Sequence, residues 1–212
     1  MKRVHQYVIS TVIVFAIFVG FILIVPKGSF EWGIDVGDSF YYEMRTWGDH
    51  GNQYLAGIPR NTLLILNNTV FETAIITLPP VNWITGAESF LTSVVRAIKV
   101  NCSFVNGTAI PSRVNDIVSE IISGCLLPIG DWSVLDSFYE DEIAPWEPSQ
   151  EYYAAKLLED RFVFEWMSYG DFDSREDWIG EVALENGVPY KIVWHYNHSM
   201  ADIYIELSLV DS

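Results

Sequence analysis

Apolar residues recur at three different spacings along this chain, and each spacing predicts a different kind of element. An uncharged, mostly apolar run without periodicity occupies residues 8–25. Alternating apolar and polar residues, typical of strands with one buried face, dominate residues 40–110 and 161–209. Between them, apolar residues return every three or four positions around 114–122, which is the period of an amphipathic helix.

The run at residues 8–25 is long enough to span a membrane. As a helix, its 18 residues would extend about 27 Å, close to the thickness of a bilayer's hydrocarbon core. It is longer than the apolar region of a cleavable signal and lacks a small-x-small cleavage site. Lys2 and Arg3 precede it, so the positive-inside rule places the N-terminus in the cytoplasm. The predicted parts are a cytoplasmic tail (1–7), a retained transmembrane signal anchor (8–26), a stem (27–32) and an extracytoplasmic domain (33–212).

The alternating stretches predict hairpins early in the external domain and a three-stranded meander at its end. The first predicted strand is 40–47, and residues 62–80 and 94–110 each predict two strands joined by an Asn-containing turn. Each C-terminal strand carries one apolar face, so one side of this sheet should meet a core. The three faces are Trp178, Gly180, Val182 and Leu184; Tyr190, Ile192, Trp194 and Tyr196; and Ile203, Ile205, Leu207 and Leu209.

The clearest helix is predicted for residues 112–123. Ser112 is a candidate cap, and Gly124 ends the periodic run. Its apolar face consists of Val114, Ile117, Val118, Ile121 and Ile122. A second, short helix is predicted after an Asp131 cap, and a third from near Ser149 to residue 160.

These elements together predict the fold class. A one-sided antiparallel sheet must cover its apolar face, and the helices predicted between residues 112 and 160 are the available cover. Strands, helices and strands follow one another in that order, so we predict an α+β fold. In this fold the antiparallel sheet packs on two or three helices, and a curved half-barrel over the helices is one arrangement that fits.

Composition then limits the partners. Aromatic residues make up 15% of the chain and charged residues only 19%, which describes a packed globule rather than a disordered tail. The net charge of −16 repels phosphate backbones, so we exclude nucleic acid as a partner. Solubility, calcium and a cationic partner are three explanations of this charge that the sequence leaves open.

Signals for glycosylation and for a disulfide all lie beyond the predicted anchor. Four N-x-S/T sequons, more than chance predicts, are candidate N-glycosylation sites. They are Asn67, Asn101, Asn106 and Asn197. An oxidising exterior favours a disulfide between Cys102 and Cys125, with two buried free thiols as the alternative.

The external domain opens with WGIDVGDSFYYEM at residues 32–44, an approximate W-x-V-x-x-G-D-x-F-x-Y pattern. The matching residues are Trp32, Gly37, Asp38, Phe40 and Tyr42, with Ile34 in the Val position. Together with the apolar segment before it, this opening resembles a loosely defined, uncharacterised group of exported or membrane-anchored archaeal surface proteins. The resemblance covers about 11 of 212 residues. It implies a glycosylated archaeal cell-surface protein with an oxidising exterior, and it carries over no catalytic residue.

Few patterns in the sequence point to chemistry. The G-x-S-x-G, H-E-x-x-H, P-loop and Rossmann patterns do not occur, so no catalytic residue and no organic cofactor is predicted. Asp171, Asp173 and Asp177 match the first, third and seventh positions of an EF-hand loop. Arg175 and Glu176 stand where that loop needs Asp or Asn and then Gly. A looser calcium site is therefore one interpretation of this segment, and a solvated turn is the other.

These observations favour a membrane-anchored extracytoplasmic protein that binds a ligand or contributes to envelope structure, rather than an enzyme. One hypothesis is an apolar or lipid-like ligand held between sheet and helices. Its candidate contacts are Trp178, Leu184, Tyr190 and Trp194, which could equally form a solid core. The alternatives are a protein–protein contact module at the cell surface and an extracellular hydrolase.

The retained anchor leads to a direct prediction. Because residues 8–25 lack a cleavage site, protein extracted from membranes should have its full mass and an intact N-terminus. N-terminal sequencing and intact mass spectrometry measure both. A mature chain that begins near Ser29 would instead mean that the segment is a cleaved signal.

Overall fold

The computed structural model describes residues 29–49, 63–81, 84, 90–139, 151–169, 174–198 and 201–210. The predicted tail and anchor, 1–26, lie outside these residues, as do the candidate calcium ligands Asp171 and Asp173. No helix within the described ranges has both the length and the apolar character that crossing a membrane requires.

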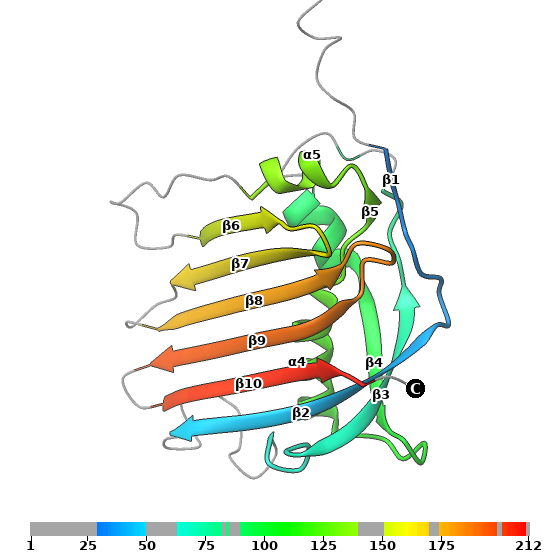
Figure 1. The fold of residues 1–212 in the computed structure, drawn as a ribbon. Coiled ribbons are helices and arrows are strands. Elements are labelled where there is room, and N and C mark those ends of the chain that lie inside the picture. The colour runs from blue at the N-terminus through cyan, green and yellow to red at the C-terminus, as the bar shows by residue number, and fades with distance from the viewer. Residues whose placement is uncertain are drawn as a thin grey trace, which may run out of the picture.

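The domain is built on one antiparallel sheet of eight strands in the order β4-β3-β2-β10-β9-β8-β7-β6 (Figure 1). A second, two-stranded sheet pairs β1 with β5. The strands are β1 (Phe30–Glu31), β2 (Ser39–Asp49), β3 (Thr69–Thr77), β4 (Lys99–Phe104), β5 (Ile129–Gly130), β6 (Glu151–Leu157), β7 (Arg161–Tyr169), β8 (Arg175–Ala183), β9 (Pro189–His198) and β10 (Ala201–Leu209). The helical elements are η1 (Phe90–Val94), η2 (Val95–Ala97), α4 (Ser112–Ser123) and α5 (Trp132–Ser137).

The predicted α+β class is wrong, because strands make up 52% and helices only 18% of the described residues, a mainly β composition. The third predicted helix, from near Ser149 to residue 160, is instead the edge strand β6. It pairs with β7 from Glu151↔Ser168 to Leu157↔Phe162. Pairing with a neighbouring strand thus overrides the helix propensity of the alanines, lysine and leucines in this segment.

The first half of the chain contains fewer strands than predicted. β2 confirms the strand at 40–47, but only the second half of 62–80 forms a strand, β3. Leu63 and Leu66 are buried in a turn that precedes β3, and Asn68 adopts a left-handed φ of 56°. In 94–110 only β4 is a full strand, and the segment after its turn forms a single bridge, Ser103↔Ala109.

The predicted C-terminal meander is confirmed. β8, β9 and β10 pair in sequence, with Trp178 opposite Trp194 and Trp194 opposite Ile205. Gly187 turns the chain between β8 and β9 with a φ of +74°. A Cβ at this position would clash with the carbonyl oxygen of Leu127, so both the backbone conformation and the space require glycine.

Helix α4 matches the predicted range, and its apolar face packs on the sheet. Val114, Val118, Ile121 and Ile122 are buried, as the spacing predicts. The predicted Ser112 cap is wrong, because Pro111 precedes the first turn and no side chain caps it. The Asp131 cap of α5 is confirmed, since its carboxylate accepts a hydrogen bond from the Val134 amide at 3.2 Å.

The residues of the W-x-V-x-x-G-D-x-F-x-Y pattern hold the start of the domain in place. Trp32 Nε1 donates to the Pro79 carbonyl at 2.7 Å, and the Tyr42 hydroxyl donates to the Pro189 carbonyl at 2.7 Å. The Asp38 carboxylate accepts from the Asp35 amide at 2.8 Å, which stabilises the turn before β2. These contacts give the pattern a structural role.

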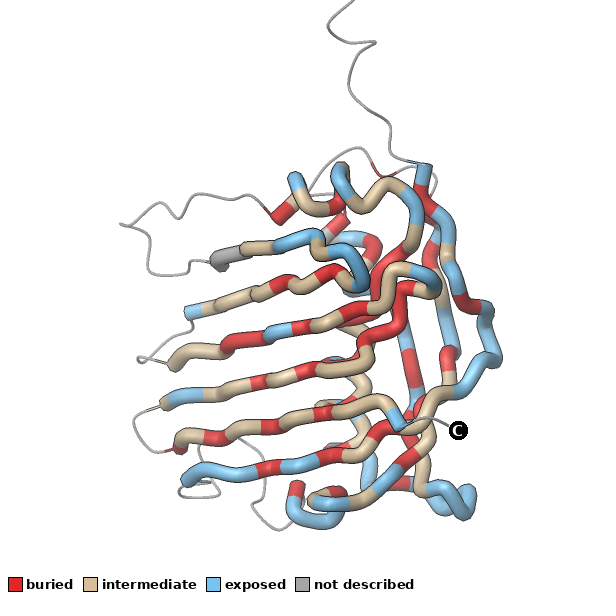
Figure 2. The backbone as a smooth tube through the Cα atoms, in the orientation of Figure 1, coloured by how far each residue is buried: buried red, intermediate tan, exposed pale blue. Residues whose placement is uncertain are grey.

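One face of the large sheet is buried and the other meets water. Buried residues alternate with more exposed ones over much of β2 and of β7 to β10 (Figure 2). The inner face packs against α4, which crosses behind the strands in Figure 1. The outer face carries ion pairs such as Lys191–Glu206 at 3.2 Å and Arg161–Glu181 at 3.3 Å.

The predicted Cys102–Cys125 disulfide is not present, because both cysteines are buried free thiols. Cys102 Sγ lies 3.5 Å from the hydroxyl oxygens of Thr73 and Ser119. Ser119 precedes Cys125 by six residues, which corresponds to roughly 9 Å along a helix, whereas bonded sulfurs lie about 2 Å apart. Burial raises the pKa of both thiols, so each should be unreactive in the folded protein.

A thiol assay tests this state of the cysteines. Unfolded, unreduced protein should react with two equivalents of a thiol reagent, and the folded protein should react slowly because both sulfurs are buried. A Cys102→Ala variant should give one equivalent and serves as the control. The absence of reactive thiols in the unfolded wild-type protein would mean that the disulfide forms.

Candidate ligand-binding site

A partly open pocket of about 450 Å³ lies between the inner face of the sheet and the helical layer. Strands β7 and β8 form one wall, and α4 and η2 form the other. The residues that line it are Val95, Arg96, Glu120, Ser123, Gly124, Tyr139, Phe164, Trp166, Ser168 and Trp178. Its size is within the range of small-molecule sites in proteins.

The sheet wall of the pocket is a consequence of strand register. Trp166 on β7 stands opposite Trp178 on β8, which stands opposite Trp194 on β9. All three point to the inner face, so they form a row of indoles across three strands. The rings of Trp166 and Trp178 lie 5.0 Å apart between centroids and are inclined by 52°. They form an angled aromatic wall.

Two glycines let aromatic rings lie close to the backbone at this wall. Gly124 follows the last turn of α4, and a Cβ there would lie only 2.8 Å from Trp178 Cζ3. Gly180 on β8 faces Phe164, whose ring occupies the space that a side chain would need. The indole of Trp178 therefore packs directly against the end of α4, and the Phe164 ring lies across β8.

Glu176 is an acidic residue on the inner face at this end of the sheet. It lies two residues before Trp178 on β8, and its register partners are Ser168 and Tyr196. Burial raises the pKa of its carboxyl group, and the nearby negative charge of Glu120 on α4 raises it further. The Trp178 indole partly offsets this rise in pKa, although its buried N–H makes no hydrogen bond of ordinary geometry.

Polar groups mark the mouth of the pocket, whereas its deeper wall is aromatic. Arg96 and Glu120 are exposed, and Ser123 and Ser168 are half-buried. Tyr139 and Phe164 are only 2% and 3% exposed, and their ring centroids lie 5.4 Å apart. An apolar body can therefore enter deeply while polar groups remain at the opening.

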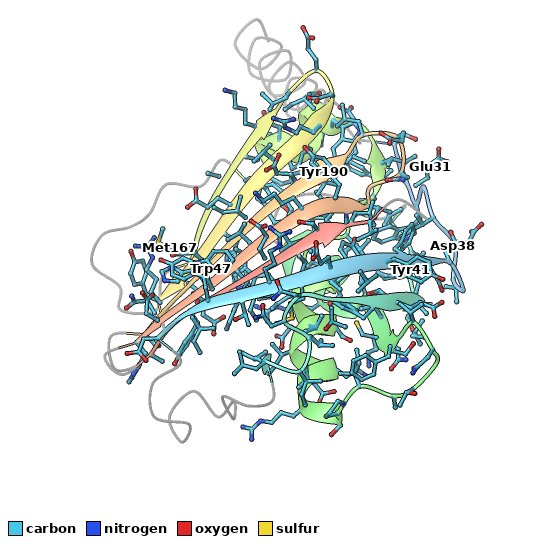
Figure 3. All side chains as sticks on the ribbon, turned by 60° about the horizontal axis from the view of Figure 1, so that its bottom comes forward. Glu31, Asp38, Tyr41, Trp47, Met167 and Tyr190 are labelled. Atoms are coloured by element: carbon cyan, nitrogen blue, oxygen red, sulfur yellow. The ribbon has the colours of Figure 1, made fainter. Side chains whose placement is uncertain are left out.

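The four residues proposed from sequence as ligand contacts have different positions. Trp178 lines the pocket, and Trp194 stands next to it in the same row without lining it. Leu184 packs against the core beyond the end of β8. Tyr190 lies on the side of the sheet opposite α4, where its hydroxyl donates to Glu181 at 3.0 Å (Figure 3).

A bulge explains the position of Tyr190. Glu181 pairs with Lys191 and Val182 with Pro189, so Tyr190 is an extra residue on β9. Both Tyr190 and Lys191 then oppose Glu181, and the simple alternation that assigned Tyr190 to the inner face fails at this point.

Asp177, the candidate calcium ligand that the structure describes, lies on the outer face in a network of charged side chains. Its carboxylate accepts from Arg175 Nε at 2.7 Å and lies 3.0 Å from His195 Nδ1. The other ring nitrogen of His195 lies 2.7 Å from Asp202. Within the described ranges, no three or more His, Cys, Asp or Glu side chains form a group suited to a metal ion.

Tyr204 and Trp47 continue this outer-face network as a ring stack. The ring centroids of His195 and Tyr204 lie 4.0 Å apart, with an angle of 7° between the ring planes. The ring centroids of Trp47 and Tyr204 lie 5.4 Å apart, with an angle of 4° between the planes. These side chains come from β9, β10 and β2 and pack against one another on the outer face.

The candidate glycosylation sites lie at or near the surface. Asn101, Asn106 and Asn197 are exposed, and Asn67 is half-buried with its Oδ1 accepting from the Thr46 amide at 2.9 Å. Asn101 stands on β4, one of the two edge strands of the sheet. Glycosylation at these four positions stays a prediction.

Sequence reasoning missed most of the pocket. Trp166 and Phe164 were within a predicted strand, and their spacing from Ser168 could have placed all three on one face. Glu120 and Arg96 carried no such signal. They come from helical elements far away in sequence, and only the folded chain brings them to the pocket.

Comparisons with protein-family models, with curated proteins and with solved structures find no match to this chain. The pocket's own geometry is therefore the basis for a functional proposal. Its features are a concave shape, an aromatic wall and a few polar groups at its mouth, the features of a small-molecule binding site.

The raised pKa of Glu176 gives a prediction for stability. Folding favours the protonated form of the Glu176 carboxyl, so the protonated group contributes to stability at pH values below the usual pKa of Glu. This contribution is lost as the pH rises through the raised pKa of the folded state. Glu176→Gln should therefore match the wild type in Tm under acidic conditions and exceed it at neutral pH. Thermal melts from acidic to neutral pH measure the difference.

Glu185→Gln is the matched control, because Glu185 is exposed in the turn after β8. Its Tm difference from the wild type should not grow in the same way with pH. A Glu176→Gln variant that is less stable than the wild type at neutral pH would contradict the assigned burial effect.

Proposed function

We propose that this is a membrane-anchored extracytoplasmic binding protein that holds a small apolar or amphipathic ligand between β7–β8 and α4. The observation that carries the proposal is the 450 Å³ pocket with its aromatic wall. Pockets of this kind exclude water from an apolar ligand, and each buried square ångström of apolar ligand surface contributes about 25 cal/mol.

The position of the pocket supports binding rather than catalysis. The outer-face His195 is hydrogen-bonded between Asp177 and Asp202, on the opposite side of the sheet from the pocket. The pocket itself combines aromatic rings with Glu120, Arg96 and two serines. A protein that only retains its ligand needs shape and apolar surface, and both are present there.

The anchor and the external location remain part of the proposal. The length of 8–25, the four sequons and the resemblance to archaeal surface proteins support them. A pocket facing the outside of a membrane would meet lipid-like or other small amphipathic molecules of the cell envelope.

Pocket filling tests the proposed function. Ser168 lines the pocket, so Ser168→Phe should occupy part of its volume and weaken binding of the neutral apolar dye N-phenyl-1-naphthylamine at least about tenfold. Dye fluorescence titrations measure the affinity. Binding in the wild type should also quench tryptophan emission, because Trp166 and Trp178 line the site.

Ser208→Phe places the same ring on β10, outside the pocket, and should leave dye affinity unchanged. Equal affinity for wild type and Ser168→Phe would show that the dye binds elsewhere. No binding to the wild type would remove the support for the proposed function.

A further inference from the structure

We propose that the ligand of this pocket carries a positively charged organic ammonium group, held beside Glu176 and Glu120 against the indoles of Trp166 and Trp178. This inference rests on the proposed function and assigns the chemical class of the ligand. It derives from the charges and ring geometry at the inner end of β8.

Glu176 is a half-buried acid without a cationic partner among the described side chains. No Lys, Arg or His of these residues lies within 4 Å of its carboxylate, although several outer-face acids have such partners. Its register neighbours, Ser168 and Tyr196, are uncharged. A carboxylate in this environment loses hydration without gaining a counter-charge, so a bound cation would stabilise its ionised form.

Glu120 strengthens the preference for a cation. It lines the pocket from α4, and its negative charge is close enough to raise the pKa of Glu176. Glu176 borders the same hollow, because its register partner Ser168 and its neighbour on the same face of β8, Trp178, both line it. The negative charge of Glu120 repels that of an ionised Glu176 carboxylate. One positive ligand charge between them would relieve that repulsion.

The aromatic wall suits an organic cation. Trp166 and Trp178 meet at 52° with centroids 5.0 Å apart, which presents two inclined indoles on one side of the pocket. Indole faces attract ammonium groups more strongly than other aromatic rings do. A divalent metal would need several oxygen ligands in place of these carbon surfaces. The indole wall of Trp166 and Trp178 can therefore contact both the ammonium group and the apolar part of such a ligand.

Arg96 does not reverse this charge preference. Arg96 is exposed at the mouth and already interacts with another group of the protein. Charges in contact with solvent are screened by water and salt, whereas a half-buried carboxylate is screened less. The edge of the pocket beside Trp178, where Glu176 lies half-buried, therefore favours a positive ligand group.

Three amphiphiles with the same octyl chain test the inference on the full-length protein. They are octyltrimethylammonium, octyl glucoside and octanoate, used below their micelle concentrations and measured by isothermal titration calorimetry at neutral pH. Octyltrimethylammonium should bind at least about tenfold more tightly than the neutral and anionic probes. The Glu176→Gln variant should lose most of this preference for the cation but keep the wild-type affinity for octyl glucoside.

Glu120→Gln changes an exposed residue of α4 and gives a second variant that should fold. It should weaken binding of octyltrimethylammonium without weakening binding of octyl glucoside. Glu185→Gln should behave as the wild type. Equal affinity for all three probes, or a preference that survives both pocket variants, would overturn the inference and leave the binding function standing. If none of the probes binds and none displaces the neutral dye, the proposed function itself fails.

Discussion

The main constraint on the structure is that the helix packed on the apolar face of the sheet is shorter than the sheet is wide. Eight strands have seven spacings of about 4.8 Å, so the sheet is roughly 34 Å wide. Helix α4 has 12 residues and is about 18 Å long, so it can cross only part of that width. The remaining inner surface, at β7 and β8, must be covered by other groups or be left open.

The pocket lies where this cover ends. The last turn of α4 and Gly124 pack on Trp178, while α5 and Tyr139 cover the inner face farther along β7. The pocket beside Trp166 and Trp178 lies between these two contacts. On the outer face, by contrast, aromatic and charged side chains stack and pair with one another.

The sequence predicted the elements with strong periodicity and short connections. α4 and the β8–β10 meander followed from apolar spacing, because each could be recognised within one local segment. β6 was assigned to a helix, since its strand state depends on pairing with β7. The prediction that Tyr190 lies on the inner face was wrong because one extra residue in β9 reverses the alternation. The pattern of apolar and polar residues gives no sign of this bulge.

The site was predictable only in part for the same physical reason. Trp178 was recognised as an inward aromatic, and a hollow between sheet and helices was among the hypotheses. Its second wall comes from Glu120 and Arg96, whose approach to Trp178 depends on how far α4 extends over the sheet. The predicted disulfide failed similarly, because it required knowledge of the distance between β4 and the end of α4.

Xenon binding in a crystal of the protein tests the central claim most directly, because xenon enters apolar hollows that side chains do not fill. The account predicts a xenon site between α4 and the indoles of Trp166 and Trp178. Side chains that close this space, with no xenon between the helix and the sheet, would contradict it.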